Sequence, residues 1–106
     1  IELKRMNQDG RLPGCIVDGP LSYDLCMDAQ SARVKGLNSE VAGDADLIIY
    51  PNLVVGNAVS KALVLSAGAV GSSIILGTSV PVVLPSRSAS VEEKARNILL
   101  AAASVR

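Results

Sequence analysis

Short apolar runs alternate along the chain with stretches of helical character. Four runs of three or four apolar residues are typical of strands buried on both faces: 15–17, 47–50, 74–76 and 82–84. The stretches around them predict helices at 1–8, 23–34, about 57–68 and from residue 91 onward. This alternation predicts an α/β fold with a mainly parallel sheet covered by helices.

Polar residues and glycines mark the ends of these helices. Ser22, Asn57 and Ser90 stand where N-caps are expected, and Gly36 and Gly68 stand at helix ends. In the last helix, apolar residues recur at the spacing of an amphipathic helix: Val91, Ala95, Ile98, Ala102 and Val105.

The amino-acid composition excludes several classes of function. The 106 residues form one domain at most, and 49% are apolar, which is ample for a core. Ten basic residues balance ten acidic ones, and Tyr23 and Tyr50 are the only aromatic residues, so nothing indicates nucleic-acid binding. The chain has no histidine, which excludes His-based general bases and His-ligated metals within it.

Cysteine spacing and hydropathy indicate a cytoplasmic protein with no membrane contact. Cys15 and Cys26 lack metal-site spacing, and we expect both to be buried free thiols. The apolar stretch 58–76 is interrupted by Lys61 and by glycines, so we expect a helix and a buried strand there. No secretory h-region opens the sequence.

Polar clusters follow three of the predicted strands. They are Asp18-Gly19-Pro20, Pro51-Asn52 and Pro85-Ser86-Arg87. Because ligands bind beyond the carboxyl ends of parallel strands, we expect these clusters to line one cleft. Neither GxGxxG nor GxxxxGK[ST] occurs, so the Rossmann and P-loop interpretations gain no support.

Ser86 and Arg87 precede a helix start, which is a combination suited to anions. A guanidinium can hold a phosphoryl group bidentately, a serine adds a donor, and a helix N-terminus adds amide N–H groups. The ordinary alternative is an exposed loop arginine that pairs with Glu92 or Glu93.

The remaining candidates each have a structural explanation as well. Glu93 completes a capping box with Ser90, or acts as a general base. Asn52, Gly56 and Asn57 form a strand-to-helix loop that could also orient a substrate carbonyl, and Asp18 and Gly19 form a turn first and a site second.

Taken together, three strings resemble the C-terminal part of the phosphate acetyl/butyryl transferases, with the butyryl branch closer. They are VDGPLSYD, SEVAGDADLIIYPNLVVGN and PVVLPSRSASVEE. The resemblance implies exchange of a short acyl group between coenzyme A and inorganic phosphate. It implies no metal and no permanently bound cofactor, with coenzyme A as a substrate. It also implies three-layer α/β/α architecture like that of the isocitrate/isopropylmalate dehydrogenases, and dimerisation.

Residue roles follow from the same resemblance. Arg87 would bind phosphate and stabilise the reacting carbonyl with help from Ser86, and Glu93, with Glu92 as a rival, would deprotonate the thiol. The PNLVVGN loop would face the cleft with Asn52 and Asn57. Asp44 and Asp46 fit the transferase pattern rather than a metal-dependent dehydrogenase.

Members of the family are several hundred residues long, so this chain resembles a C-terminal fragment. Residues 1–80 would form the C-terminal half of an inserted domain, and 81–106 the returning strand and the C-terminal helix of the first domain. We expect an oligomer or association with a missing N-terminal segment, because apolar faces would otherwise stay uncovered. The alternative is a fragment that binds coenzyme A or phosphate without turnover, and the preferred acyl group stays open.

Overall fold

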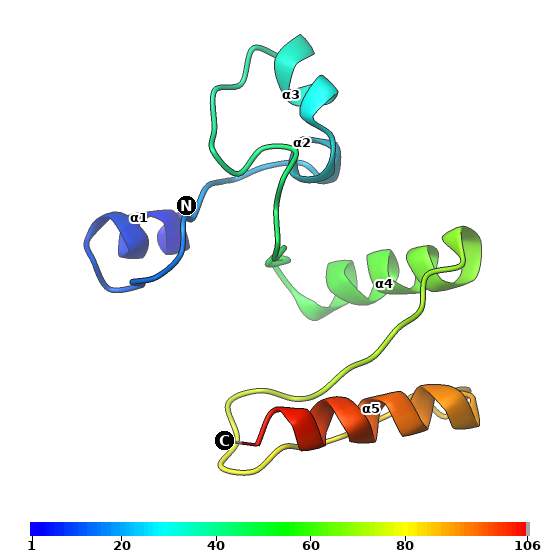
Figure 1. The fold of residues 1–106 in the computed structure, drawn as a ribbon. Coiled ribbons are helices and arrows are strands. Elements are labelled where there is room, and N and C mark those ends of the chain that lie inside the picture. Colours follow the sequence, from blue (N-terminus) through cyan, green and yellow to red (C-terminus); the bar gives the residue numbers. More distant parts are fainter. Residues whose placement is uncertain (106) are drawn as a thin grey trace. The chain divides into compact units, whose positions relative to one another are not determined.

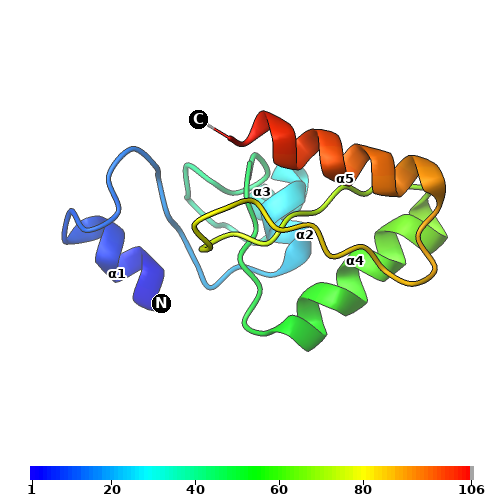
Figure 2. The same ribbon diagram turned by 90° about the horizontal axis from the view of Figure 1, so that it is seen from below.

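A computed structural model describes residues 1–105, and the chain divides into two compact units, Ile1–Tyr50 and Pro51 onward (Figure 1). The first unit contains α1 (Glu2–Gln8), α2 (Tyr23–Met27) and α3 (Ala29–Val34). The second unit contains α4 (Leu53–Ala67) and α5 (Val91–Ala103), joined by a long extended segment (Figure 2). The predicted domain boundary between residues 80 and 81 refers to a longer protein and stays a prediction.

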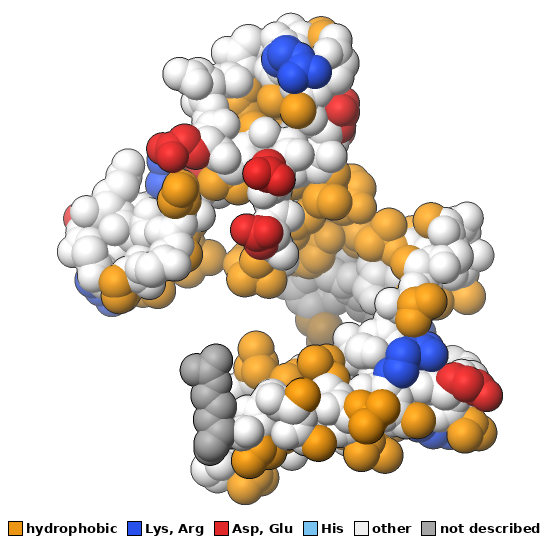
Figure 3. Space-filling view, viewed as in Figure 1, with side chains coloured by type: hydrophobic (Ala, Val, Ile, Leu, Met, Phe, Trp, Pro, Cys, Tyr) orange, Lys and Arg blue, Asp and Glu red, His pale blue; other side chains and the backbone are white. Residues whose placement is uncertain are grey.

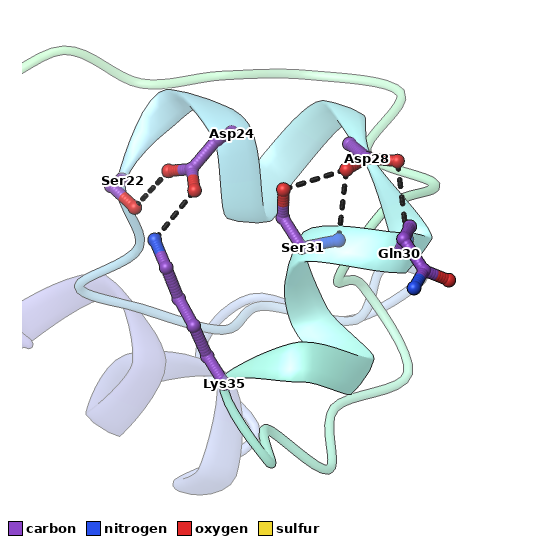
Figure 4. Close-up of polar contacts among 6 residues, drawn as sticks. All are labelled: Ser22, Asp24, Asp28, Gln30, Ser31 and Lys35. Atoms are coloured by element: carbon purple, nitrogen blue, oxygen red, sulfur yellow. Dashed lines mark hydrogen bonds and ion pairs between the residues drawn. The ribbon is translucent and has the colours of Figure 1, made fainter.

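The single helix predicted over 23–34 is wrong, because Asp28 divides it into α2 and α3. Asp28 is extended, with φ of −133°, and its carboxylate accepts hydrogen bonds from the amides of Gln30 at 3.1 Å and Ser31 at 2.8 Å (Figure 4). A short acidic side chain caps a new helix better than it continues an old one. Apolar spacing alone could not reveal this break.

Polar side chains tie the short helices of the first unit together. Ser22 is the N-cap residue of α2, as predicted, but its hydroxyl donates to Asp24 Oδ1 at 2.5 Å and does not accept from a helix amide. Lys35 at the end of α3 reaches back to Asp24 with Nζ–Oδ2 of 2.5 Å (Figure 4). The Lys35 ammonium, followed by the Ser22 hydroxyl, lowers the pKa of Asp24 to about 2.

Gly43 makes the tightest backbone approach in this unit. Its φ is +80°, and a Cβ placed on it would lie 2.4 Å from the backbone N and Cα of Ala29. Its amide donates to the carbonyl of Leu25 at 2.8 Å. Only a residue without a side chain fits here, so Gly43 lets the loop 41–46 close onto the α2–α3 junction.

In the second unit α4 begins at Asn52, not at Asn57 as predicted. The Asn52 side-chain oxygen accepts from the amide of Val55 at 3.0 Å, and Asn57 lies inside the helix. Asn52 can cap because its own backbone is extended, with φ of −162° and ψ of 168°. The predicted end at Gly68 is confirmed, with a left-handed φ of 68°, and so is Ser90 as the cap of α5, accepting from the Glu93 amide at 3.1 Å.

The predicted strands are unpaired within residues 1–105, apart from one antiparallel bridge. This bridge joins Ile75 and Val82, with the Ile75 amide 2.9 Å from the Val82 carbonyl oxygen. A strand pairs through backbone hydrogen bonds to at least one neighbouring strand, and the described residues supply only this one contact. The parallel sheet therefore stays a prediction.

The described chain leaves much apolar surface exposed. It exposes 8232 Å², whereas a compact 10.9 kDa protein exposes about 5,600 Å² and two separate compact halves about 6,700 Å² together. Its buried apolar side chains are all small: Cys26, Ala32, Ala89 and Ala101. Cys15 is exposed, so its predicted burial is wrong, because the extended segment around it has no partner strand.

Helix α5 shows this exposure most clearly. Val91 is 76% exposed and Ile98 61%, whereas the buried residues of α5 are Asn97 and Ala101, so α5 turns its large apolar side chains outward. Figure 3 shows hydrophobic side chains along the outer surface of α5. No helix among residues 1–105 has the length and apolar character needed to cross a bilayer.

Candidate functional site

The second unit contains a pocket of about 200 Å³ whose walls combine polar and apolar groups. It lies between α4, the segment that follows α4, the loop before α5 and the first turn of α5. Its polar lining consists of Ser60, Lys61, Ser72, Ser73, Ser86, Ser88 and Glu93. Hydroxyl groups and one ammonium therefore converge with one carboxylate on a space of small-molecule size.

Helix α4 contributes one side of the pocket through its few polar positions. Its sequence is apolar around most of its circumference, but Asn57, Ser60 and Lys61 share one face at i, i+3 and i+4. Ser60 and Lys61 line the pocket, with Val64 one turn further along. The helix thus directs its only basic residue toward the serines.

The Ser86–Ala89 turn forms a second side. The Ala89 amide donates to the Ser86 carbonyl at 3.0 Å, and the hydroxyls of Ser86 and Ser88 are 3.0 Å apart. The Ser88 amide also approaches the Ser86 hydroxyl at 3.4 Å. These contacts hold two hydroxyl groups next to each other at the pocket. The role of Ser86 as a donor to phosphate stays a prediction.

The first turn of α5 separates the two candidate bases. Glu93 lines the pocket, whereas Glu92 is exposed and does not. Hydrogen bonds from its own amide and from Ser90 lower the pKa of Glu92. The amide of Glu93 donates to the Ser90 hydroxyl at 3.1 Å, so one of the helix-start amides expected to cradle an anion is already occupied.

Arg87 is exposed and does not line this pocket. It forms no ion pair with Glu92 or Glu93 in the described chain, so the ordinary interpretation of a paired loop arginine is not realised there. Its position between Ser86 and Ser88 places it beside two lining residues. Its role in binding phosphate stays a prediction.

The other predicted site residues fall into two groups. Asn52 caps α4 with its side chain, and Gly56 and Asn57 lie in the first turns of that helix, outside the pocket lining. Asp18 and Gly19 belong to the first unit, where Asp18 accepts from Lys4 at 2.5 Å and from the Gly19 amide at 2.8 Å. A common cleft for all of them stays a prediction.

Lys61, Ser72 and Ser73 were not predicted as site residues. A signal existed in the distribution of charge rather than in its total. Residues 51–105 carry four basic and two acidic residues, whereas residues 1–50 carry five basic and eight acidic ones. Within 51–105 none of the basic side chains forms an ion pair. Unpaired cations beside hydroxyl groups favour a small anion such as phosphate.

No group of three or more His, Cys, Asp or Glu residues is close enough to hold a metal ion in the part of the chain that the structure describes. The pocket also contains a single carboxylate, from Glu93. The chemistry it can perform is therefore anion binding by donors, with one group able to accept a proton.

Comparison with known proteins decides the family. The family model described as "Phosphate acetyl/butaryl transferase" matches residues 3–102. The chain belongs to this family. The resemblance of the three sequence strings to this family is thereby confirmed, whereas the closer similarity to the butyryl branch stays a prediction.

Relatives of the phosphate acetyl/butyryl transferase family match nearly the whole chain. A phosphate acetyltransferase of Thermotoga maritima is 48% identical and a phosphate butyryltransferase of Clostridium acetobutylicum 43% identical, each over 94% of this chain. These matches cover 34% and 33% of the two relatives, so the chain spans about a third of their length.

A solved structure supports the same assignment at the level of the fold. The crystal structure of a branched-chain phosphotransacylase from Enterococcus faecalis V583 is similar with a TM-score of 0.79 and 35% identity. The match covers 95% of this chain and 39% of that one. The chain therefore has the fold of part of a phosphotransacylase.

Proposed function

We propose that this chain is the C-terminal part of a phosphate acyltransferase, which exchanges a short acyl group between coenzyme A and inorganic phosphate in the cytoplasm. Membership of the phosphate acetyl/butyryl transferase family supports the reaction. The observation that carries the proposal to particular residues is the donor-rich pocket of Lys61, Ser86 and Ser88 beside one carboxylate, Glu93.

In the longer protein, the unpaired extended segments would join a three-layer α/β/α fold with a mainly parallel sheet. Backbone amides and carbonyls that lack ladder partners in this chain are the groups that neighbouring strands would satisfy. The exposed apolar side chains of α5 would also be covered there, because a large apolar patch is unfavourable in water. Association with an upstream segment, or with a second copy, would provide it.

The reaction assigns a role to each group. Glu93 takes the proton from the coenzyme A thiol, and the thiolate attacks the carbonyl carbon of the acyl phosphate. The carbon–oxygen bond to phosphate then breaks, giving acyl-CoA and inorganic phosphate. Arg87, with Ser86, stabilises the charge on the carbonyl oxygen and on the leaving phosphate.

Pocket size limits which part of the substrates this chain holds. Its volume of about 200 Å³ lies below the roughly 300–1,000 Å³ of sites that enclose drug-sized ligands. Phosphate and a short acyl group match that volume, and coenzyme A does not. Most of the coenzyme would contact residues outside this chain.

A chimera tests the proposal. The last third of the Clostridium acetobutylicum phosphate butyryltransferase would be replaced by this chain, and thiol release from butyryl-CoA would be followed with and without phosphate. We expect phosphate-dependent release that falls by about two orders of magnitude in Arg87→Ala. Lys94→Ala, an exposed basic residue of α5 outside the pocket lining, is the matched control. Unchanged release in the Arg87 variant would contradict the assignment.

The second candidate is a fragment that binds phosphate or coenzyme A without turnover. The large exposed apolar surface favours this candidate for the chain on its own, because it indicates that further residues cover the chain and complete the site in the longer protein. Activity in the chimera together with phosphate binding but no thiol release by the chain alone would establish this candidate for the isolated piece.

A further inference from the structure

Asn97 is the one residue of the described chain that is both polar and buried, and it lies beside the pocket without lining it. It is completely inaccessible, in the middle of a helix whose apolar residues are largely exposed. Burying a side-chain amide costs free energy unless its polar atoms are bonded. A buried amide in this place therefore indicates a specific task.

The Asn97 side chain holds two separate walls of the pocket together. Its Oδ1 accepts a hydrogen bond from the backbone amide of Ser73 at 2.8 Å, across 24 residues of sequence. Ser73 lines the pocket from the segment after α4, and Glu93 lines it from α5. Glu93 and Asn97 are four residues apart on α5, so they share one helix face.

The orientation of the amide is fixed by this bond. The Ser73 N–H is a donor, so the atom facing it must be the oxygen, and Nδ2 is then left buried without a partner among the described residues. An unbonded buried donor is unfavourable, and a leucine or alanine in its place would remove that cost. The chain keeps the amide despite this cost, which favours a role beyond stability.

We propose that Asn97 is a positioning residue, which fixes the Ser72–Ser73 wall relative to Glu93, so that the serine donors hold the bound phosphate group while the carboxylate beside them stays free to take the thiol proton. The inference rests on the proposed function for its ligand, and on the 2.8 Å bond for its geometry. Asn97 touches no substrate, because it is completely buried.

Amide hydrogen exchange on the 106-residue chain tests the geometry. In Asn97→Ala, the Ser73 amide should exchange about tenfold faster, because its acceptor is gone. Asn97→Asp retains an oxygen at the same place and should restore slow exchange. Ala101→Gly weakens the same helix one turn further along and should leave the Ser73 amide protected. Unchanged exchange in Asn97→Ala would overturn the proposal.

Titration of the same variants with inorganic phosphate tests the function. The dissociation constant should rise about tenfold in Asn97→Ala, recover in Asn97→Asp and stay unchanged in Ala101→Gly. Faster Ser73 exchange with unaltered phosphate affinity would show a purely structural residue and overturn the proposal. Failure of the unaltered chain to bind phosphate would count against the proposed function, while the exchange data still decide whether Asn97 holds the wall.

Discussion

Residues 1–50 pair many of their charges within the unit, whereas the charges of residues 51–105 form no ion pair. The three ion pairs of the first unit are Lys4–Asp18, Arg5–Glu2 and Lys35–Asp24. The second unit has four basic and two acidic side chains among its described residues, and no ion pair joins them. Paired charges support local structure, and unpaired ones are available to a ligand. The difference in pairing therefore favours the second unit as the place of an anion site.

A substitution at the closest backbone contact of the first unit should have the largest effect, and this effect is on the free energy of unfolding. In Gly43→Ala, the new methyl group would meet Ala29 at 2.4 Å while φ remains +80°. We expect a loss of about 3 kcal/mol or more in unfolding free energy, measured by urea denaturation. Gly36→Ala is the matched control, since its φ is +64° but nothing lies within 4 Å, and it should cost only about 1 kcal/mol. Equal losses in both variants would contradict the close contact.

Removing the proposed base should have the next largest effect, this time on activity. In the chimera, Glu93→Gln should lower the rate of thiol release about 100-fold, because a general base contributes about that much. Glu92→Gln should leave the rate within about twofold, because Glu92 is exposed and outside the pocket. The reverse order of effects would transfer the role to Glu92.

A substitution of Lys61 should affect phosphate binding more than the chemical step. Lys61→Met retains the apolar part of the side chain and removes the charge, so the KM for phosphate should rise about tenfold with kcat changed much less. Lys94→Met removes an exposed positive charge outside the pocket lining and controls for net charge. Equal changes in KM for the two variants would indicate a general field effect only.

The corrected start of α4 can be tested through its cap. Asn52→Ala should lower the unfolding free energy by about 1 kcal/mol, because the Val55 amide loses its acceptor. Asn57→Ala lies within the helix and should be neutral or slightly stabilising. Thermal unfolding of both variants would decide, and a larger loss for Asn57→Ala would restore the cap predicted from the sequence.

The smallest effect concerns the Lys4–Asp18 pair of the first unit. Hydrogen bonds from Lys4, then from Ser39 and Gly19, lower the pKa of Asp18 from 3.8 to about 2. A pKa lowered by folding means stabilisation that is present above about pH 4 and is lost as the pH falls toward 2. Because the Lys4 side chain is partly exposed, solvent screens the pair, and Asp18→Asn should cost only about 0.5 kcal/mol near neutral pH.

Urea unfolding at several pH values would check this prediction. The difference between Asp18→Asn and the unaltered chain should shrink steadily as the pH falls below about 4. Asp46→Asn, in an exposed loop, is the control. A difference that stays constant down to pH 2 would mean that the Asp18 carboxylate is not stabilised by folding.

Local chemistry could be predicted from the sequence where a residue acts on its neighbours. Ser90 as a cap and Gly68 as a helix end depend on side chains and backbone within a few residues, and both predictions are confirmed. Asp28 also acts locally as the cap of α3, but the break there could not be predicted, because the apolar spacing of 23–34 suits one helix as well as two. The family could be recognised because several separated strings agree in order.

The parts that could not be predicted depend on contacts between distant segments. Lys61 and Ser73 share a pocket with Glu93 only because α4, the segment after it and α5 converge. The inward face of α5 could not be foreseen either, because Asn97 is buried by a bond to Ser73 rather than by apolar spacing. Apart from the Ile75–Val82 bridge, the predicted strands lack partners within the described residues, so the parallel sheet stays a prediction.

Phosphate titration of the 106-residue chain, followed by the backbone amide signals of both units, would show whether residues 51–105 contain the anion-binding site. We expect saturable shifts at Ser72, Ser73, Ser86 and Ser88, with no such shifts around Asp18 and Asp24. Arg87→Ala and Lys61→Met should each weaken the response. An absence of shifts at the four serines, or equal shifts in both units, would place no anion site in residues 51–105.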